Sequence, residues 1–332
     1  MSAAAVHPRR ALLLAGASAL AMPFVRPARA AEPFRLVTNW YAQPDQGGFF
    51  QAQATGLYRA AGIDVAIQGG APQLNVSQLL LAGAVDAIIG FDTEVLSQVA
   101  RGMPLVTVAA MFQYDQEGLL VHDDVQRIEQ LRDRTLMIAT NSQGGFWPWL
   151  KQRFGFTDEQ TRAYSDNLQP FMLDPRIAIQ AIATAEPCQL RRRGIPFRFL
   201  AFRDYGYPTY SCTVVTRRDV AERDPSRLRA FLQASIQGYR DYLGGNPEPA
   251  NAIIRRENRN LGQDDIDCAI RTIKASAVCT GGDAAHGGIG VMTEARWRAT
   301  YAFMVRYGLL PAQADWQRAF SLDFLPAHPV LP

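Results

Sequence analysis

The 332-residue sequence lacks the excess of positive charge that a nucleic-acid-binding protein needs. It contains 34 Lys and Arg against 31 Asp and Glu, for a net charge of +3. Four of the arginines, Arg9, Arg10, Arg26 and Arg29, lie in residues 1–30, which hold no acid, so the rest of the chain has a net charge of −1. Affinity for nucleic acid comes largely from neutralising phosphates with a basic face. We therefore expect no nucleic-acid partner.

The sequence also lacks the motifs of the common catalytic and metal-binding classes. It has no GxSxG, HExxH or GxxxxGK[ST] motif. Ser142 lies in a small polar stretch, residues 141–145, but no sequence argument brings a histidine near it to act as its base. The carboxylates are scattered along helix faces and are not clustered as metal ligands would be. We expect no catalytic residue, no metal and no cofactor.

Cysteine is scarce and irregularly spaced. The four cysteines are Cys188, Cys212, Cys268 and Cys279, and none forms a CxxC pair. This spacing does not predict a metal site. Four cysteines allow three disulfide pairings, among which Cys268 and Cys279 could close a short loop, and buried free thiols are an equal alternative.

One long apolar run is present, and it lies near the N-terminus. Arg9 and Arg10 precede the apolar residues 11–25, and Ala28-Arg29-Ala30 fits an A-x-A cleavage site. The run is shorter than the roughly 20 residues needed to span a bilayer. We predict an export signal over residues 1–30, cleaved after Ala30, that delivers the chain to the periplasm. The paired arginines resemble a twin-arginine leader, so the choice between the Sec route and the twin-arginine route of export stays open.

The chain after the leader alternates short β-rich runs with helical patterns and ends in long amphipathic helices. This alternation is typical of parallel strands joined by crossover helices, the α/β class. We expect strands at 34–40, 63–68, 85–91, 105–112, 118–122, 135–140, 198–202 and 210–216, and helices at 47–61, 76–82, 93–101, 125–132, 147–154, 175–183, 225–243, 247–258, 263–277 and 293–307.

The alternation of β-rich runs and helical patterns begins again after residue 122, which predicts two α/β lobes. Lobe 1 would comprise residues 31–118 and 214–332, and lobe 2 residues 119–213. The ligand cleft is then expected between the lobes, with a hinge in the two extended connections. One larger continuous sheet would produce the same alternation of strands and helices.

Aromatic and polar residues recur at the carboxyl ends of predicted strands, where open α/β sheets hold their ligands. Rings could stack on a flat solute, and a chain entering a helix could present free N–H groups. For each candidate, core packing, helix capping or a solvated turn is the alternative. The candidates are Trp40, Tyr41, Asp92, Thr140, Ser142, Gly144, Gly145, Trp147, Glu186, Tyr205 and Tyr207.

Two stretches resemble one family of periplasmic proteins. Residues 38–52 (TNWYAQPDQGGFFQA) and 55–65 (TGLYRAAGIDV) are similar to the periplasmic substrate-binding proteins of the sulfonate, nitrate and thiamine-pyrimidine-precursor group. Shorter matches at Gly69-Gly70, Asn75, residues 78–83, Asp86 and residues 293–297 extend the resemblance over the chain after the leader. The resemblance implies a two-lobed, type II periplasmic-binding-protein fold. It also implies a monomeric, non-enzymatic receptor that delivers a small-molecule solute to the permease and ATPase subunits of an ABC importer.

The resemblance also implies site residues. Carried over residue by residue, it places Trp40, Gly47, Gly48, Asn75, Asp92, the loop 140–145 and Glu186 at the cleft. The aromatic walls and Glu186 resemble the thiamine-pyrimidine branch, in which a heterocycle stacks on rings and a carboxylate accepts from its amino group. An oxyanion such as an alkanesulfonate or nitrate is the alternative ligand. Eukaryotic relatives synthesise the pyrimidine with a cysteine-rich motif, and no run of adjacent cysteines occurs here, so a synthase is the less favoured alternative.

Overall fold

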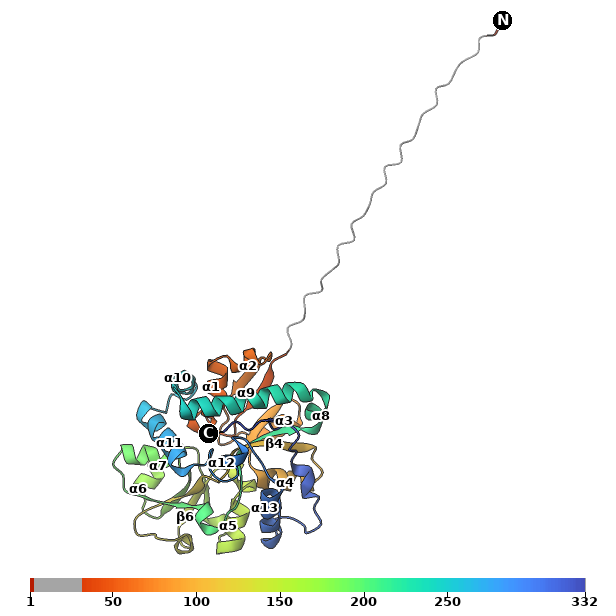
Figure 1. The fold of residues 1–332 in the computed structure, drawn as a ribbon. Helices are drawn as coiled ribbons and strands as arrows, with labels where there is room; N and C mark the ends of the chain where they lie inside the picture. Colours follow the sequence, from red (N-terminus) through yellow and green to blue (C-terminus); the bar gives the residue numbers. More distant parts are fainter. Residues whose placement is uncertain (3–31, 332) are drawn as a thin grey trace. The chain divides into compact units, whose positions relative to one another are not determined.

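The computed structural model describes residues 1–2 and 32–331 (Figure 1). The chain divides into two units, residues 1–32 and 33–332, and the helices and strands given below belong to the second. The predicted export signal and its cleavage after Ala30 lie outside the described residues. In the part of the chain that is described, no helix is long and apolar enough to cross a membrane.

The second unit contains two five-stranded sheets, and the first of them, sheet A, has the order β2-β1-β3-β10-β4. Its strands are β1 (Phe34–Val37), β2 (Val65–Gln68), β3 (Ala87–Gly90), β4 (Leu105–Phe112) and β10 (Ser211–Arg217). Strand β1 pairs in parallel with β2 and β3, whereas β10 pairs antiparallel with β3 and β4. Every residue of β4 is buried, as expected for a strand covered on both faces.

The second sheet, sheet B, has the order β7-β6-β8-β5-β9. Its strands are β5 (Glu117–Val121), β6 (Thr135–Ile138), β7 (Thr161–Ala163), β8 (Ile177–Ile182) and β9 (Arg198–Ala201). Strand β6 runs parallel to β7 and β8, whereas β5 runs antiparallel to β8 and β9.

Both sheets are therefore mixed, and the expectation of parallel strands throughout is wrong for β5 and β10. The reason lies in the two connections between the sheets. Residues 113–116 carry the chain directly from β4 to β5 without a crossover helix, and residues 202–210 return it to β10. Strands β5 and β10 are thus the strands that the chain enters from the other sheet, whereas the strands that pair in parallel within a sheet are joined through intervening helices.

The helices flank these sheets. They are α1 (Gly47–Ala54), α2 (Leu57–Ala60), α3 (Val76–Leu81), α4 (Asp92–Ala100), α5 (Trp147–Phe154), α6 (Gln169–Leu173), α7 (Glu186–Arg192), α8 (Arg218–Arg223), α9 (Pro225–Gly244), α10 (Glu248–Glu257), α11 (Gln263–Ser276), α12 (Ala284–Gly287) and α13 (Glu294–Arg306). The single helix expected at 47–61 is divided at Gly56, whose φ of 77° is left-handed and favours glycine. The long helix α9 packs on α1 and α2 (Figure 1).

The helix expected at 175–183 is wrong, because these residues form strand β8. Short apolar runs fit both periodicities, so the sequence pattern alone does not decide between them. In the structure Ile177–Ile182 lies in the middle of sheet B between β6 and β5, and its four central residues are buried. Burial on both faces favours isoleucine in a strand. The neighbouring elements β7, α6 and α7 were not predicted.

A disulfide joins Cys188 in α7 to Cys268 in α11, across 80 residues of sequence. Cys212 and Cys279 are buried free thiols, so the short loop between Cys268 and Cys279 does not form. An ion pair between Arg192 and Asp265, 2.9 Å from Nε to Oδ1, joins the same two helices. Helix α7 follows strand β8 of sheet B, whereas α11 follows the helices packed beside sheet A.

Candidate functional site

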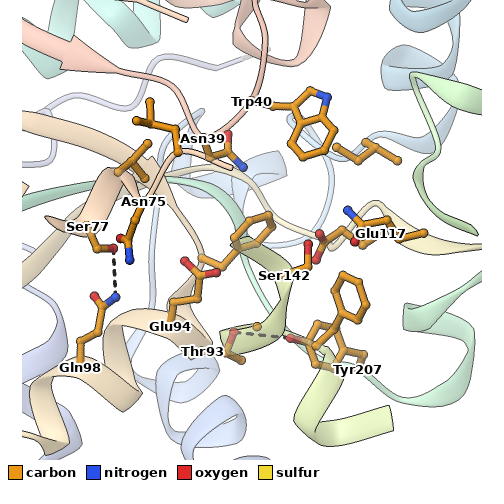
Figure 2. A pocket seen from close by; sticks show the side chains of 17 residues that line it. Asn39, Trp40, Asn75, Ser77, Thr93, Glu94, Gln98, Glu117, Ser142 and Tyr207 are labelled. Carbon is orange, nitrogen blue, oxygen red and sulfur yellow. Dashed lines mark hydrogen bonds between the residues drawn. The ribbon is translucent and has the colours of Figure 1, made fainter. Parts of the chain in front are cut away.

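A cavity of about 140 Å³ lies where strands from both sheets end. Residues after β1 and β3 of sheet A line it together with residues of β8, residues in the segment after β6 and the first residue of β5 in sheet B (Figure 2). A cavity of about 150 Å³ holds one benzene ring, so the space suits a small solute. The lining residues are Asn39, Trp40, Leu74, Asn75, Val76, Ser77, Phe91, Thr93, Glu94, Gln98, Glu117, Ser142, Gly145, Phe146, Gln180, Ile182 and Tyr207.

Four aromatic rings contribute to the lining: Trp40, Phe91, Phe146 and Tyr207. Trp40 follows a strand of sheet A but packs in an apolar cluster with residues of sheet B, and only 5% of it is exposed. Tyr207 packs on Trp149 with 4.8 Å between ring centroids, and its hydroxyl lies 3.4 Å from Thr93 Oγ1. These rings are held in place by the core and offer apolar faces to a solute.

Two carboxylates, those of Glu94 and Glu117, also line the cavity (Figure 2). Glu94 lies in the first turn of α4 after sheet A, and Glu117 begins β5 of sheet B. Burial raises the pKa of Glu94 to about 7. Burial also raises the pKa of Glu117 well above its usual range, and the nearby charges of Asp115, Glu94 and Glu186 raise it further. Within the described residues neither side chain has a hydrogen bond or an ion pair.

Side-chain amides line the rest of the cavity and tie its elements together. Asn75 Oδ1 accepts a hydrogen bond from Gln78 N at 3.1 Å and caps α3. Gln98 Nε2 donates to Ser77 Oγ at 2.9 Å and so joins α4 to α3. Gln180 Oε1 accepts from Ala139 N at 2.7 Å. No Lys, Arg or His is among the residues that line this cavity.

A second cavity of about 30 Å³ adjoins the first and shares four lining residues with it, including Glu117. Asp45, in the short 3-10 helix η1 (Pro44–Gln46), lies on its wall. Thr184 Oγ1 donates to both carboxylate oxygens of Asp45 at 2.8 Å, and Gln43 Nε2 donates to Oδ2 at 2.9 Å. Burial raises the pKa of Asp45 to about 6. The bond to Thr184 joins the sheet A side of the molecule to the chain after β8.

The structure brings five of the residues named from the sequence together at the larger cavity: Trp40, Asn75, Ser142, Gly145 and Tyr207. They come from both sides of the cavity, and the first two follow β1 and precede α3, respectively. Their role in binding stays a prediction.

Three other candidates pack in the core or against it and line neither cavity. Trp147 is 1% exposed, and its indole Nε1 donates to Asp158 Oδ1 at 2.8 Å. The hydroxyl of Tyr205 accepts a hydrogen bond from Ile128 N at 3.3 Å. Tyr41 is half-buried and packs edge-on against Trp40, with 6.1 Å between centroids. None of the three is among the residues that line the cavities.

Gly47 and Gly48 are placed by helix packing and do not line either cavity. A Cβ on Gly47 would lie 2.2 Å from the Tyr242 ring, and one on Gly48 would lie 2.1 Å from the Tyr239 ring. These glycines allow α1 to approach α9 closely. Tyr239 OH in turn donates to the carbonyl oxygen of Asp45 at 2.6 Å, so the packing supports η1 beside the second cavity.

Asp92 and Glu186 are buried acids with protein partners. Asp92 accepts hydrogen bonds from Tyr210 N at 3.1 Å and Thr300 Oγ1 at 2.9 Å, and burial raises its pKa to about 6. Glu186 accepts from Tyr164 OH at 3.0 Å and Ile182 N at 2.8 Å, and burial raises its pKa to about 8. Neither lines a cavity. Thr140 and Gly144 are exposed and do not line one either.

Several lining residues were missed by sequence reasoning. Glu94 stands two residues after Asp92, within the first turn of the helix expected at 93–101. Glu117 is a lone acid at the start of an apolar strand, which is a signal that could have marked it. Gln180 was hidden because its strand was predicted as a helix. The position of Asn39 next to Trp40 is the sequence feature that could have marked it as a lining residue.

The fold is that of the periplasmic binding proteins. A solved structure of a conserved Candida albicans gene product, described as having the generic periplasmic binding protein fold, matches with a TM-score of 0.64. The two chains are 15% identical, and the match covers 89% of this chain and 98% of the other. The fold class predicted from the sequence is confirmed.

The chain belongs to the NMT1/THI5-like family, whose model matches residues 43–250. It is 25% identical to the riboflavin-binding protein RibY of Chloroflexus aurantiacus over 329 residues, which cover 92% of this chain and 91% of that protein. A shorter match of 91 residues, at 28% identity, is to a 4-amino-5-hydroxymethyl-2-methylpyrimidine phosphate synthase of Saccharomyces cerevisiae and covers 27% of each chain. The predicted family is confirmed.

Proposed function

We propose that the protein is an exported receptor that binds a small heterocyclic solute in the larger cavity and delivers it to the permease and ATPase of an ABC importer. The observation that carries the proposal is a ring-lined cavity at the carboxyl ends of strands from two sheets, with acceptors from both sides. This is the place where open α/β sheets bind small molecules. The export signal predicted at residues 1–30 would deliver the receptor to the periplasm.

The lining favours a heterocycle over an oxyanion. Trp40 and Tyr207 offer ring faces with hydrogen-bonding groups beside them, as a flat polar solute requires. A sulfonate or nitrate would meet the carboxylates of Glu94 and Glu117 and no basic side chain of the lining. The similarity to a riboflavin-binding protein over most of the chain also supports a ring-bearing ligand.

Ligand-dependent closure of two lobes would couple binding to transport. The lobes would be residues 31–118 with 214–332, and residues 119–213, joined by the connections 113–116 and 202–210. The receptor would act as a monomer. A ligand that contacts both lobes binds the closed state more tightly than the open state, and so shifts the equilibrium toward closure. The hydrogen bonds from Thr184 to Asp45 support such a closed state, because they join the two sides beside the cavity.

Binding without catalysis is supported by the groups that surround the cavities. Cys212, the thiol on the wall of the second cavity, is buried, and burial raises its pKa to about 12, so it stays protonated and weakly nucleophilic. No run of adjacent cysteines like that of the pyrimidine-forming relatives occurs in the sequence. The match to the yeast synthase spans about a quarter of each chain, whereas the match to the riboflavin-binding protein spans nearly all of both.

A ligand panel tests the proposal. The mature protein is heated with riboflavin, 4-amino-5-hydroxymethyl-2-methylpyrimidine, ethanesulfonate or nitrate, and saturable stabilisation is expected from a heterocycle. Stabilisation by an oxyanion alone would overturn the heterocyclic class. Each compound is then recovered after incubation and analysed by mass spectrometry. Chemical conversion of a bound compound would overturn the proposal that the protein is not an enzyme.

A further inference from the structure

We propose that the cavity selects a positively charged aromatic solute, such as an amidine or a protonated aminoheterocycle, and that Glu94 and Glu117 are its specificity-determining residues. This inference rests on the proposed function and names the class of solute. Both carboxylates line the cavity, and within the described residues neither has a hydrogen-bond or ion-pair partner. Each therefore has acceptor capacity that only a ligand or water can satisfy.

The two carboxylates approach the cavity from different sheets. Glu94 follows strand β3 of sheet A in the first turn of α4, and Glu117 begins strand β5 of sheet B. A cation held by both would therefore bridge the two halves of the site. Charged donors bind carboxylates more strongly than neutral ones, particularly where water is excluded.

An independent observation gives a further acceptor with no donor. Gln116 Oε1 is buried without a hydrogen bond, and the residue is 4% exposed on the wall of the adjoining cavity. The amide of Gln116 already donates to Asp45 Oδ1 at 3.3 Å, so its oxygen is the group left over. A buried acceptor without a partner is unfavourable. A donor carried by the solute, or by a water bound beside it, would satisfy this oxygen.

The surroundings add a further acid, and no Lys, Arg or His is among the residues that line the larger cavity. Asp115 is buried next to Glu117, and its Oδ1 accepts from Glu117 N at 2.8 Å. The nearby guanidinium of Arg296 is held elsewhere, because it donates to Gln113 O at 2.7 Å and lies 4.6 Å from the centroid of the Tyr210 ring. Burial raises the pKa of Glu94 and Glu117, and a bound cation would lower it again and stabilise the ionised carboxylates, whereas an anion would not.

The rings complete the recognition of an aromatic cation. Trp40 and Tyr207 line the same cavity as the carboxylates (Figure 2). A cation over such a ring gains attraction from the negative ring face, and more so when it is desolvated. The cavity volume of about 140 Å³ suits a single aromatic ring.

Three compounds of nearly the same shape test the charge directly. Benzamidine is a cation, benzamide is neutral and benzoate is an anion at neutral pH. Titration calorimetry of each into the mature protein should show benzamidine binding at least about tenfold more tightly than benzamide, with no binding of benzoate. Equal or tighter binding of benzamide or benzoate would overturn the inference, as would the failure of all three to bind at millimolar concentration.

The residue assignment is tested with Glu94→Gln and Glu117→Gln, and with Glu222→Gln on the exposed face of α8 as the control. Each cavity variant should lose about tenfold or more in benzamidine affinity while benzamide affinity changes little. Each should melt no lower than the parent protein, because it removes a buried carboxylate without a partner. Unchanged benzamidine affinity in both variants would overturn the assignment.

The outcomes separate this inference from the proposed function. If a neutral heterocycle binds tightly and benzamidine does not, the receptor proposal stands and the charge inference fails. If benzamidine binds but is chemically converted, the charge inference stands and the proposal of a non-catalytic receptor fails.

Discussion

Individual residues around the cavity have structural partners as well as a place on its wall. Asn75 caps α3 through Oδ1, and its amide nitrogen has no partner among the described residues. Gly48 shows the opposite case, because its small size is required by the Tyr239 ring and it does not reach the cavity. A residue at a family motif can therefore serve packing, binding or both, and only its contacts distinguish these roles.

Substitution of Asn75 should separate the helix-capping role of its side-chain oxygen from any role of its amide nitrogen. Asn75→Ala is expected to lower the free energy of unfolding by about 1 kcal/mol, whereas Asn75→Ser keeps a capping oxygen and most of the stability. Urea denaturation measures both. Gln78→Ala, on the exposed side of the same helix, is the control and should be close to neutral. Equal stability of the Ala and Ser variants would show that the cap contributes little.

At the scale of elements, helix α7 is attached to α11 by two different interactions. The disulfide between Cys188 and Cys268 and the ion pair between Arg192 and Asp265 join the same two helices. Helix α7 begins with Glu186, which accepts a hydrogen bond from Ile182 N, and Ile182 lines both cavities. The covalent link therefore lies one element away from the candidate site.

Loss of the disulfide should destabilise the fold. The double variant Cys188→Ser, Cys268→Ser is expected to lower the free energy of unfolding by about 2 to 5 kcal/mol, because the link closes a long loop in the unfolded chain. Denaturation is measured with and without a reductant. The parent protein should lose stability when it is reduced, and the double variant should be insensitive. Equal stability of the oxidised and reduced parent would contradict the prediction.

At the scale of the whole molecule, several acids are buried or half-buried. Burial raises the pKa of Asp45, Asp92 and Asp166 to about 6, that of Glu94 and Asp115 to about 7 and that of Glu186 to about 8. These carboxyl groups hold protons in the folded state at a pH at which the unfolded chain releases them. Folding and protonation are therefore linked.

The linkage predicts that stability rises as the pH falls from about 8 to about 5, since the folded state binds more protons than the unfolded state over this range. Below about pH 4 the trend should reverse. The pKa of Asp86 is lowered, despite partial burial, by its hydrogen bonds and ion pair with Arg35. When such carboxylates become protonated, the stabilisation from these interactions is lost. Melting temperature against pH measures the curve. Glu94→Gln should show a smaller rise between pH 8 and 5, and a maximum near pH 8 in the parent would contradict the prediction.

Sequence alone determined the family and the α/β class of this protein. Strands such as β4 and helices such as α5 were predicted with their observed bounds, because an apolar run or a helical period is a local property of the chain. The placement of Trp40 shortly after β1, and so beside a cavity, also follows from local order together with the rule for open sheets.

Only the tertiary structure decided which side chains share the cavity. Burial between two neighbours made residues 177–182 a strand, and that strand brought Gln180 to the site. Glu94 and Glu117 line one cavity because two sheets meet there, and the pairing of Cys188 with Cys268 depends on two helices far apart in sequence. Such contacts depend on packing between distant segments, which no local pattern of residues records.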